Sequence, residues 1–270
     1  MSASDKVFAG SIPKMYDDCM VPLIFAAFAG DLAHQAATFS PAAVLETAAG
    51  TGVLTRALAP KLSANACYVV TDLNQPMLDY AAQRQGQDRR ITWQQADALA
   101  LPFPDAHFDV VCCQFGAMFF PDRTKGYQEA NRVLKPGGSF LFNVWDRIDD
   151  NVFAHEVTIA LAEVFPDDPP NFLARTPHGY HDQQLIENEL RVAGFSRVAI
   201  ERKSKQSSAP SPLNVAIAYC QGTPVRNEIE ARGADKLQAA TEHVAAAIAK
   251  LHGIGEVSAK IQALVALAQK

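Results

Sequence analysis

Short apolar runs rich in β-branched residues alternate with helical patterns along the first half of the chain. The runs predict strands, and the stretches between them place apolar side chains three or four residues apart, as amphipathic helices do. Because strands that alternate with helices build parallel sheets, the pattern predicts a series of βαβ units. The expected strands cover residues 43–48, 67–72, 90–95, 108–114 and 138–145.

The pattern continues differently beyond the fifth expected strand. The spacing predicts helices near residues 151–164 and 183–193, separated by a proline-rich loop, and then a strand at "SRVAIERK". The segment "SSAPSPLN" is expected to break the chain before a helical region over residues 213–252. One stripe of apolar side chains in that region recurs every three or four positions, which indicates core packing. Its members are Leu237, Ala240, Val244, Ile248 and Leu251.

Apolar segments near both ends of the chain complete the expected fold. A helix is expected over residues 21–37, and "KIQALVALAQ" predicts a last strand that returns to the sheet. The fold class is therefore α/β, with a Rossmann-like, doubly wound, mostly parallel sheet of about seven strands, the last one antiparallel. The expected parts are an N-terminal helical cap (1–40), a ligand-binding core (41–204), a helical insertion or lid (205–258) and a final core strand (259–270).

Composition narrows the class of partner. The chain has 270 residues, of which 49% are hydrophobic, and a formal net charge of -5. A duplex-binding surface would instead carry clustered lysine and arginine, so we expect a small-molecule substrate and no nucleic acid. Five cysteines, two of them adjacent in an apolar run at Cys112 and Cys113, indicate reduced thiols and a cytoplasmic location.

Neither a membrane partner nor secretion is expected. No stretch approaches the roughly 20 uninterrupted apolar residues of a membrane span. The N-terminal "MSASDKVFAGSIPKMYDD" lacks the apolar segment and cleavage site of a signal peptide. The sequence leaves open whether the chain works alone or as a homodimer.

The first expected strand leads into a small-residue turn and then a helix, in "AVLETAAGTGVLTRAL" (43–58). Gly50 and Gly52 allow a tight turn and expose backbone amides at the positive end of the helix, where anionic groups bind. Asp72 ends the second expected strand, where a carboxylate can accept hydrogen bonds from a ribose diol. Together these features indicate an adenosine-containing ligand at the carboxyl edge of the sheet.

Two ligands fit this arrangement, a dinucleotide and S-adenosylmethionine. The dinucleotide fingerprint G-x-G-x-x-G needs a third small residue, so that helix and strand pack closely around the pyrophosphate. That position is Thr55 when counted from Gly50. The loop therefore disfavours a nicotinamide dinucleotide.

Four successive segments, spread over about residues 40–146, resemble one family. They are "VLETAAGTG", "VVTDLNQPMLDYA", "ITWQQADALALPFPDAHFDVVCCQF" and "EANRVLKPGGSFLFNVWD". They are similar to the class I S-adenosylmethionine-dependent methyltransferases, of the branch related to the ubiquinone and menaquinone biosynthesis methyltransferases. The resemblance implies a transferase with S-adenosyl-L-methionine as its cofactor.

The resemblance also assigns parts of the cofactor to residues of this chain. The loop that opens at Glu46 would hold the methionine part, Asp72 the ribose hydroxyls, and the end of the fourth strand the sulfonium. Residues after the second and third strands would meet the adenine. The implied cofactor-binding residues are Glu46, Ala48, Gly50, Gly52, Asp72, Leu73, Asp97, Ala98, Gln114 and Phe115.

Two further expectations concern the walls of this site. Tyr16, beside Met15 ahead of the first helix, is expected to close over the cofactor. Ala48 stands where the family has its first motif glycine, so we expect its φ to be negative and its Cβ to turn away from the ligand.

Candidate acid–base residues cluster in "TPHGYHD", after the proline-rich loop. His178, Tyr180 and His181 could approach the substrate and act as a base, if the acceptor must lose a proton. In the alternative interpretation Asp182 caps the helix that follows, and the histidines are ordinary surface residues.

No metal site is expected. The two histidines have H-x-x-H spacing, but no cysteine or carboxylate set nearby completes a zinc site. The fourth expected strand ends in Gln114, Phe115 and Gly116, without the carboxylates that a hard cation would need.

The favoured function is methyl transfer to a small aromatic or otherwise apolar acceptor, on O, N, S or C, by direct in-line displacement. Two alternatives stay open. One is a nicotinamide-linked oxidoreductase, and the other is a catalytically silent module that binds S-adenosylmethionine.

Overall fold

The computed structural model describes residues 12–270. Its centre is one sheet of seven strands in the order β3-β2-β1-β4-β5-β7-β6. The strands β1 to β5 pair in parallel, and β7 is antiparallel to both of its neighbours. The predicted fold class is therefore confirmed. The strands are β1 (Ala43–Glu46), β2 (Cys67–Asp72), β3 (Ile91–Gln95), β4 (Phe108–Gln114), β5 (Leu134–Trp145), β6 (Arg197–Ala209) and β7 (Val257–Gln269).

Helices cover both faces of the sheet because successive side chains of the strands point to opposite faces. Val44 and Val110 pack in one core with α2 (Ala26–Thr38) and α3 (Val53–Leu58). Leu45 and Val111 belong to the core on the other face, under α5 (Arg123–Val133) and α8 (Gln183–Val192). The near-continuous apolar runs of β1 and β4 follow from burial on both faces.

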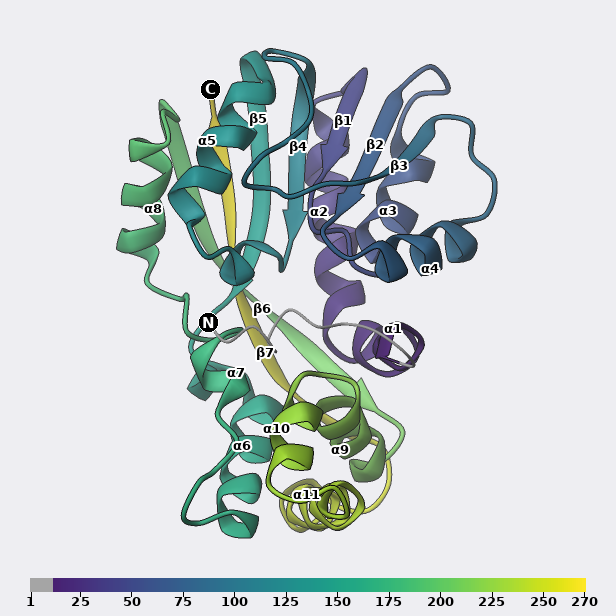
Figure 1. The fold of residues 1–270 in the computed structure, drawn as a ribbon, viewed down its shortest axis with the longest axis vertical. Helices are drawn as coiled ribbons and strands as arrows, with labels where there is room; N and C mark the ends of the chain where they lie inside the picture. Colours follow the sequence, from purple (N-terminus) through teal and green to yellow (C-terminus); the bar gives the residue numbers. More distant parts are fainter. Residues whose placement is uncertain (1–11) are drawn as a thin grey trace.

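A second group of helices gathers beyond the carboxyl ends of the parallel strands (Figure 1). The long strands β6 and β7 extend past the rest of the sheet and carry this group at their far end. Its members are α6 (Val152–Val164), α7 (Phe172–Arg175), α9 (Pro212–Gln221), α10 (Val225–Ala231) and α11 (Lys236–His252). The predicted apolar stripe packs here: Ala240, Val244 and Ile248 are buried, whereas Leu251 at the end of α11 is 64% exposed.

Two elements in the second half of the chain differ in extent from those expected, although the chain does break inside "SSAPSPLN", between Ala209 and Pro212. The strand expected at 196–203 continues as β6 to Ala209, because its whole length pairs with β7 in register. The helical region expected over 213–252 is three helices, interrupted after Gln221 and after Ala231. α4 (Gln75–Gln85) lies beside β2 and β3 as the helical spacing suggested.

The N-terminal helix is longer than the expected 21–37. It begins as α1 (Ile12–Met15), continues as a π-helix over Tyr16–Phe25 and becomes α2. Pro22 lies inside the π-helical stretch, where its missing N–H disturbs regular α-helical hydrogen bonding. The prediction that the N-terminal segment is no signal peptide falls partly on residues 1–11, which lie outside the described residues.

The same helix bears on the membrane prediction. Over Tyr16–Thr38 it is long and apolar enough to cross a membrane, and 56% of its most apolar window is buried inside the protein. A core helix of a soluble protein has the same composition, so the length and composition of this helix are weak evidence for a membrane span.

All five cysteines are free thiols, as predicted, and Cys112 and Cys113 are fully buried.

Candidate active site

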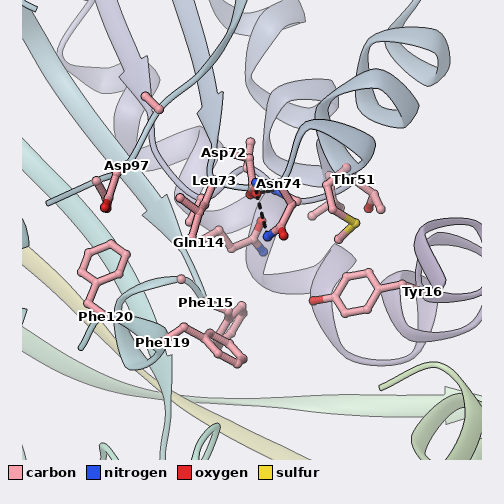
Figure 2. Close-up of a pocket in the computed structure, with 18 of the residues that line it drawn as sticks. Tyr16, Thr51, Asp72, Leu73, Asn74, Asp97, Gln114, Phe115, Phe119 and Phe120 are labelled. Carbon is pink, nitrogen blue, oxygen red and sulfur yellow. Dashed lines mark hydrogen bonds between the residues drawn. The ribbon is translucent and has the colours of Figure 1, made fainter. Parts of the chain in front are cut away.

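A cavity lies at the carboxyl edge of the sheet, at the switch point between the parallel strands β1 and β4, where the order in which strands are added to the sheet reverses. Loops that follow four successive strands line it, and the π-helix closes it from the side (Figure 2). Of the predicted cofactor residues, nine line this cavity: Tyr16, Ala48, Gly50, Asp72, Leu73, Asp97, Ala98, Gln114 and Phe115. We call it the cofactor cavity.

The prediction for the backbone of Ala48 was wrong. Its φ is +52°, in the left-handed region that favours glycine. The turn after β1 takes this shape at Gly50 (φ +56°) as well. The Cβ of Ala48 fits because position 116 is glycine: a Cβ built on Gly116 would lie 2.5 Å from that of Ala48. The strained alanine and the facing glycine are therefore one steric unit.

Glu46 and Gly52 lie behind the cavity wall. Glu46 is buried, and its Oε2 accepts hydrogen bonds from the hydroxyls of Thr55 (2.7 Å) and Tyr68. Burial raises the pKa of Glu46 to about 7. Gly52, with φ +78°, lets α3 approach α4, since a Cβ there would lie 3.0 Å from the Cβ of Ala81. Both residues support the loop from below.

Asp72 ends β2 and holds two loops together. Its Oδ2 accepts from the backbone N–H of Gly50 and its Oδ1 from that of Asn74, both at 2.8 Å. Burial raises the pKa of Asp72, while these hydrogen bonds oppose the rise. The side-chain amide of Asn74 also donates to Oδ1, at 3.4 Å. A carboxylate has about four acceptor sites, so these donors still leave capacity for a ribose hydroxyl.

Asp97 and Leu73 lie on the exposed rim of the cavity. The carboxylate of Asp97 accepts from the backbone N–H of Leu99 at 2.9 Å and so stabilises the turn after β3. The side chain of Leu73 is exposed beside the buried Asp72, and Ala98 is only partly covered. An apolar ring between these residues would gain burial.

Two buried polar atoms in the cavity wall have no hydrogen-bond partner in the described part of the chain, Thr51 Oγ1 and Gln114 Oε1. The amide nitrogen of Gln114 donates to the backbone oxygen of Phe25 at 3.0 Å, which fixes the side chain. Buried polar groups are normally satisfied, so these atoms call for a polar ligand. Together with the turn at Gly50, they fit the amino-acid end of S-adenosylmethionine.

Ion pairs tie the π-helix to the two helices beside the glycine turn. The buried carboxylate of Asp17 binds Arg56 of α3 (2.6 Å) and Arg84 of α4 (3.1 Å). Arg56 also donates to the backbone oxygen of Thr51 at 2.6 Å. This latch holds Tyr16, whose ring points into the cavity from the π-helix (Figure 2).

A second cavity adjoins the first, and four aromatic side chains line both: Tyr16, Phe25, Phe115 and Phe119. The ring of Phe115 stacks on Trp145, with centroids 3.9 Å apart and an angle of 13°. Phe115 adopts φ +50°, and its N–H donates to Oδ1 of Asn143 at 3.0 Å. We call this second space the acceptor cavity.

The predicted acid–base residues separate in the structure. His178 is buried and lines the acceptor cavity, so its interpretation as a surface residue was wrong. Tyr180 lines neither cavity, and its hydroxyl lies 3.1 Å from that of Tyr127 and donates to Glu189. His181 is partly exposed, with Nδ1 2.8 Å from the backbone oxygen of His178. Asp182 caps α8 by accepting from the N–H groups of residues 184 and 185.

Sequence reasoning missed most of the acceptor cavity. Its remaining walls come from the π-helix, the turn after β4, α7 and α9, which are distant in the sequence and read as ordinary core. A signal existed in the apolar run "FGAMFF", which contributes four aromatic or sulfur side chains to the two cavities: Phe115, Met118, Phe119 and Phe120. Among the described residues, no group of three or more potential metal ligands occurs.

Comparisons with known proteins agree with this geometry. Residues 44–138 match the model of a methyltransferase domain family. The ubiquinone/menaquinone biosynthesis C-methyltransferase UbiE of Shewanella sp. (strain ANA-3) is 29% identical over 167 residues. The match covers 57% of this chain and 66% of that protein, so the chain spans just under two thirds of the length of this curated relative.

Solved structures share the fold. The YcgJ protein of Bacillus subtilis superimposes with a TM-score of 0.56 at 21% identity, over 90% of this chain and 97% of that one. A phosphoethanolamine N-methyltransferase 2 of Haemonchus contortus, solved with S-adenosylhomocysteine, gives a TM-score of 0.54 at 18% identity, over 97% and 61% of the two chains.

The fold, the matched methyltransferase domain and the cavity agree with those of the class I, S-adenosylmethionine-dependent methyltransferases, which this chain resembles. Within that class the chain is similar to the ubiquinone and menaquinone biosynthesis methyltransferases. The predicted resemblance and cofactor are confirmed. The matched domain and the curated relative give the nicotinamide-linked alternative no support.

Proposed function

We propose that this protein transfers a methyl group from S-adenosylmethionine to a small apolar or aromatic molecule held in the acceptor cavity. The observation that carries the proposal is the shared wall: Tyr16, Phe25, Phe115 and Phe119 line both cavities. A donor in one cavity and an acceptor in the other would meet at these rings, sealed from bulk water. When bound, the cofactor supplies an electrophilic methyl group on a sulfonium.

The residues of the cofactor cavity take their proposed roles from position. Asp72 accepts from the ribose hydroxyls, since its carboxylate keeps free acceptor capacity beside the Gly50 amide. Leu73, Asp97 and Ala98 surround the adenine at the rim. Thr51 and Gln114 hold the amino-acid end through their unpartnered oxygens.

The chain's contribution to the chemistry is alignment and exclusion of water. Holding donor and acceptor in one geometry removes most of the entropic cost of bringing them together. The aromatic wall provides an environment in which a hydrated nucleophile loses its water shell. We also propose that the enzyme is cytoplasmic and binds no nucleic acid, in line with its net charge of -5.

The test uses methyl-labelled S-adenosylmethionine, the purified protein and a metabolite extract. We expect label in a low-molecular-weight apolar product, identified by mass spectrometry, and much less of it with Asp72→Ala at the same cofactor concentration. Tight cofactor binding without any labelled product would instead support the catalytically silent module. Co-purified nicotinamide nucleotide would support the oxidoreductase.

A further inference from the structure

His178 is a buried polar residue in an otherwise apolar part of the acceptor cavity. Its side chain is packed beside Trp145, and the residue as a whole is 6% exposed. Its backbone N–H donates to the oxygen of Leu173 at 3.0 Å, which fixes the loop between α7 and α8. The imidazole is thus held in place before any ligand arrives.

One hydrogen bond sets the tautomer of this imidazole. Nδ1 lies 2.8 Å from the backbone oxygen of Asp146, and a carbonyl oxygen can only accept, so Nδ1 carries the hydrogen. In the neutral ring Nε2 therefore bears a lone pair. No hydrogen bond to Nε2 occurs within residues 12–270.

The surroundings keep the ring neutral. Burial lowers the pKa of His178 to about 4, and the charge of His181 adds to this effect. The carboxylate of Asp146 acts in the opposite direction, but it is shared with Arg202 (2.5 Å) and Gln262 (2.8 Å). At neutral pH His178, which lines the acceptor cavity, thus keeps Nε2 unprotonated.

The other polar side chains that line the acceptor cavity are a threonine whose hydroxyl is already hydrogen-bonded and two tyrosines. The hydroxyl of Thr223 donates to the backbone oxygen of Tyr219 at 2.7 Å and accepts from the N–H of Val225 at 3.2 Å. Tyr16 and Tyr219 contribute neutral phenols, since burial raises both of their pKa values. Nε2 of His178 is the strongest hydrogen-bond acceptor on this wall.

We propose that Nε2 of His178 accepts a hydrogen bond from a hydroxyl group of the acceptor, so that the cavity selects neutral, planar molecules that carry a hydroxyl. The inference rests on the proposed function for the identity of the cavity. Planarity follows from the stacked Phe115 and Trp145, and neutrality from the lack of any cationic side chain among the described residues that line the cavity. His178 is a specificity-determining residue in this account.

The experiment measures binding of three probes of similar shape to the purified protein by calorimetry. The probes are 1-naphthol, 1-methoxynaphthalene and 1-naphthoate, which offer a hydroxyl, an ether and an anion on the same ring system. One hydrogen bond of about 1.4 kcal/mol corresponds to a tenfold preference. We expect 1-naphthol to bind about tenfold more tightly than the ether and the anion.

The key variant is His178→Asn. The asparagine amide can still donate to the oxygen of Asp146 from the place of Nδ1, but nothing occupies the place of Nε2. We expect the hydroxyl preference to vanish while ether binding changes less than about twofold, because the ether has no hydrogen to donate to Nε2 in the wild type. His181→Asn is the matched control, since that ring also contacts a backbone oxygen nearby, and it should keep the preference.

A pH series tests whether the ring of His178 stays neutral. Because the pKa of His178 is lowered to about 4, the preference should stay constant between about pH 6 and pH 8, whereas an ordinary histidine would lose it on protonation. Equal affinity of wild type for naphthol and ether would overturn the proposal, as would a preference that survives in His178→Asn, or no binding of any probe. Methyl transfer is not measured, so failure of the proposed function is detected separately.

Discussion

The contact between Ala48 and Gly116 yields a stability prediction that can be worked out from geometry. Ala48→Gly removes a left-handed alanine, which costs roughly 1–2 kcal/mol. The glycine offsets part of this stabilisation, because it loses more conformational entropy on folding than alanine does, at a cost of about 0.5–1 kcal/mol. We expect Ala48→Gly to raise the free energy of unfolding by about 0.5–1 kcal/mol.

Gly116→Ala should have the opposite effect. The backbone permits alanine there, with φ -104°. The new Cβ would lie 2.5 Å from the Cβ of Ala48 and 2.8 Å from Sγ of Cys113. Overpacking of this kind costs about 1–3 kcal/mol, so the substitution should lower the free energy of unfolding by that amount.

The double variant tests whether the two positions form one steric unit. With glycine at position 48 the shorter contact disappears and only the one to Cys113 remains. Residues in direct contact couple by about 0.5–3 kcal/mol, so the double variant should be more stable than the sum of the single effects by at least about 1 kcal/mol.

Urea unfolding followed by circular dichroism measures all three variants. Gly137→Ala is a control for backbone strain alone, since Gly137 has φ +79° and open space around it. Strict additivity of Ala48→Gly and Gly116→Ala would refute the steric unit. A destabilising Ala48→Gly would show that the methyl group stabilises the turn despite its strained backbone.

Three further predictions concern the carboxylates around the cofactor cavity. Asp72→Ala should weaken S-adenosylmethionine binding by about 1–3 kcal/mol through lost ribose hydrogen bonds, and unchanged affinity in calorimetry would remove Asp72 from the site. The pKa of Glu46 is raised to about 7, above its unfolded value, so its contribution to stability is full below about pH 4.5 and lost as the pH rises to 7. The advantage of Glu46→Gln over wild type in urea unfolding should therefore grow by about 3 kcal/mol between these limits, and a constant difference would contradict the burial of a neutral acid. Asp17→Asn should release Arg56 and Arg84, lower the free energy of unfolding by about 1–3 kcal/mol and raise the cofactor dissociation rate measured by stopped flow. Faster dissociation without loss of stability is also consistent with a latch, but an unchanged rate is not.

The periodic parts of the fold could be predicted from the sequence. β1 and β4 are buried on both faces, which leaves unmistakable apolar runs, and the helices between strands keep one apolar stripe. Asp72 and the glycine turn follow directly from the end of a strand and the start of a helix. These signals are local, so one sequence suffices to read them.

The missing parts depend on contacts between distant residues. The left-handed backbone of Ala48 is tolerated only because Gly116 faces it across the sheet edge, and the sequence of the turn alone suggests a relaxed alanine. The burial of His178 depends on β5 and Trp145, which no local pattern near "TPHGYHD" reveals. β6 continues past its expected end because its pairing with β7 extends through Ser207 and Ser208 to Ala209, and the strand stops directly before Pro210.

The central claim is that the cavity after β1 and β2 binds the methyl donor. Isothermal titration of the purified protein with S-adenosylmethionine, and separately with S-adenosylhomocysteine, tests it most directly. The account predicts saturable binding of both at one site per chain, with markedly weaker binding to Asp72→Ala. Failure of the folded wild-type protein to bind either compound would contradict it.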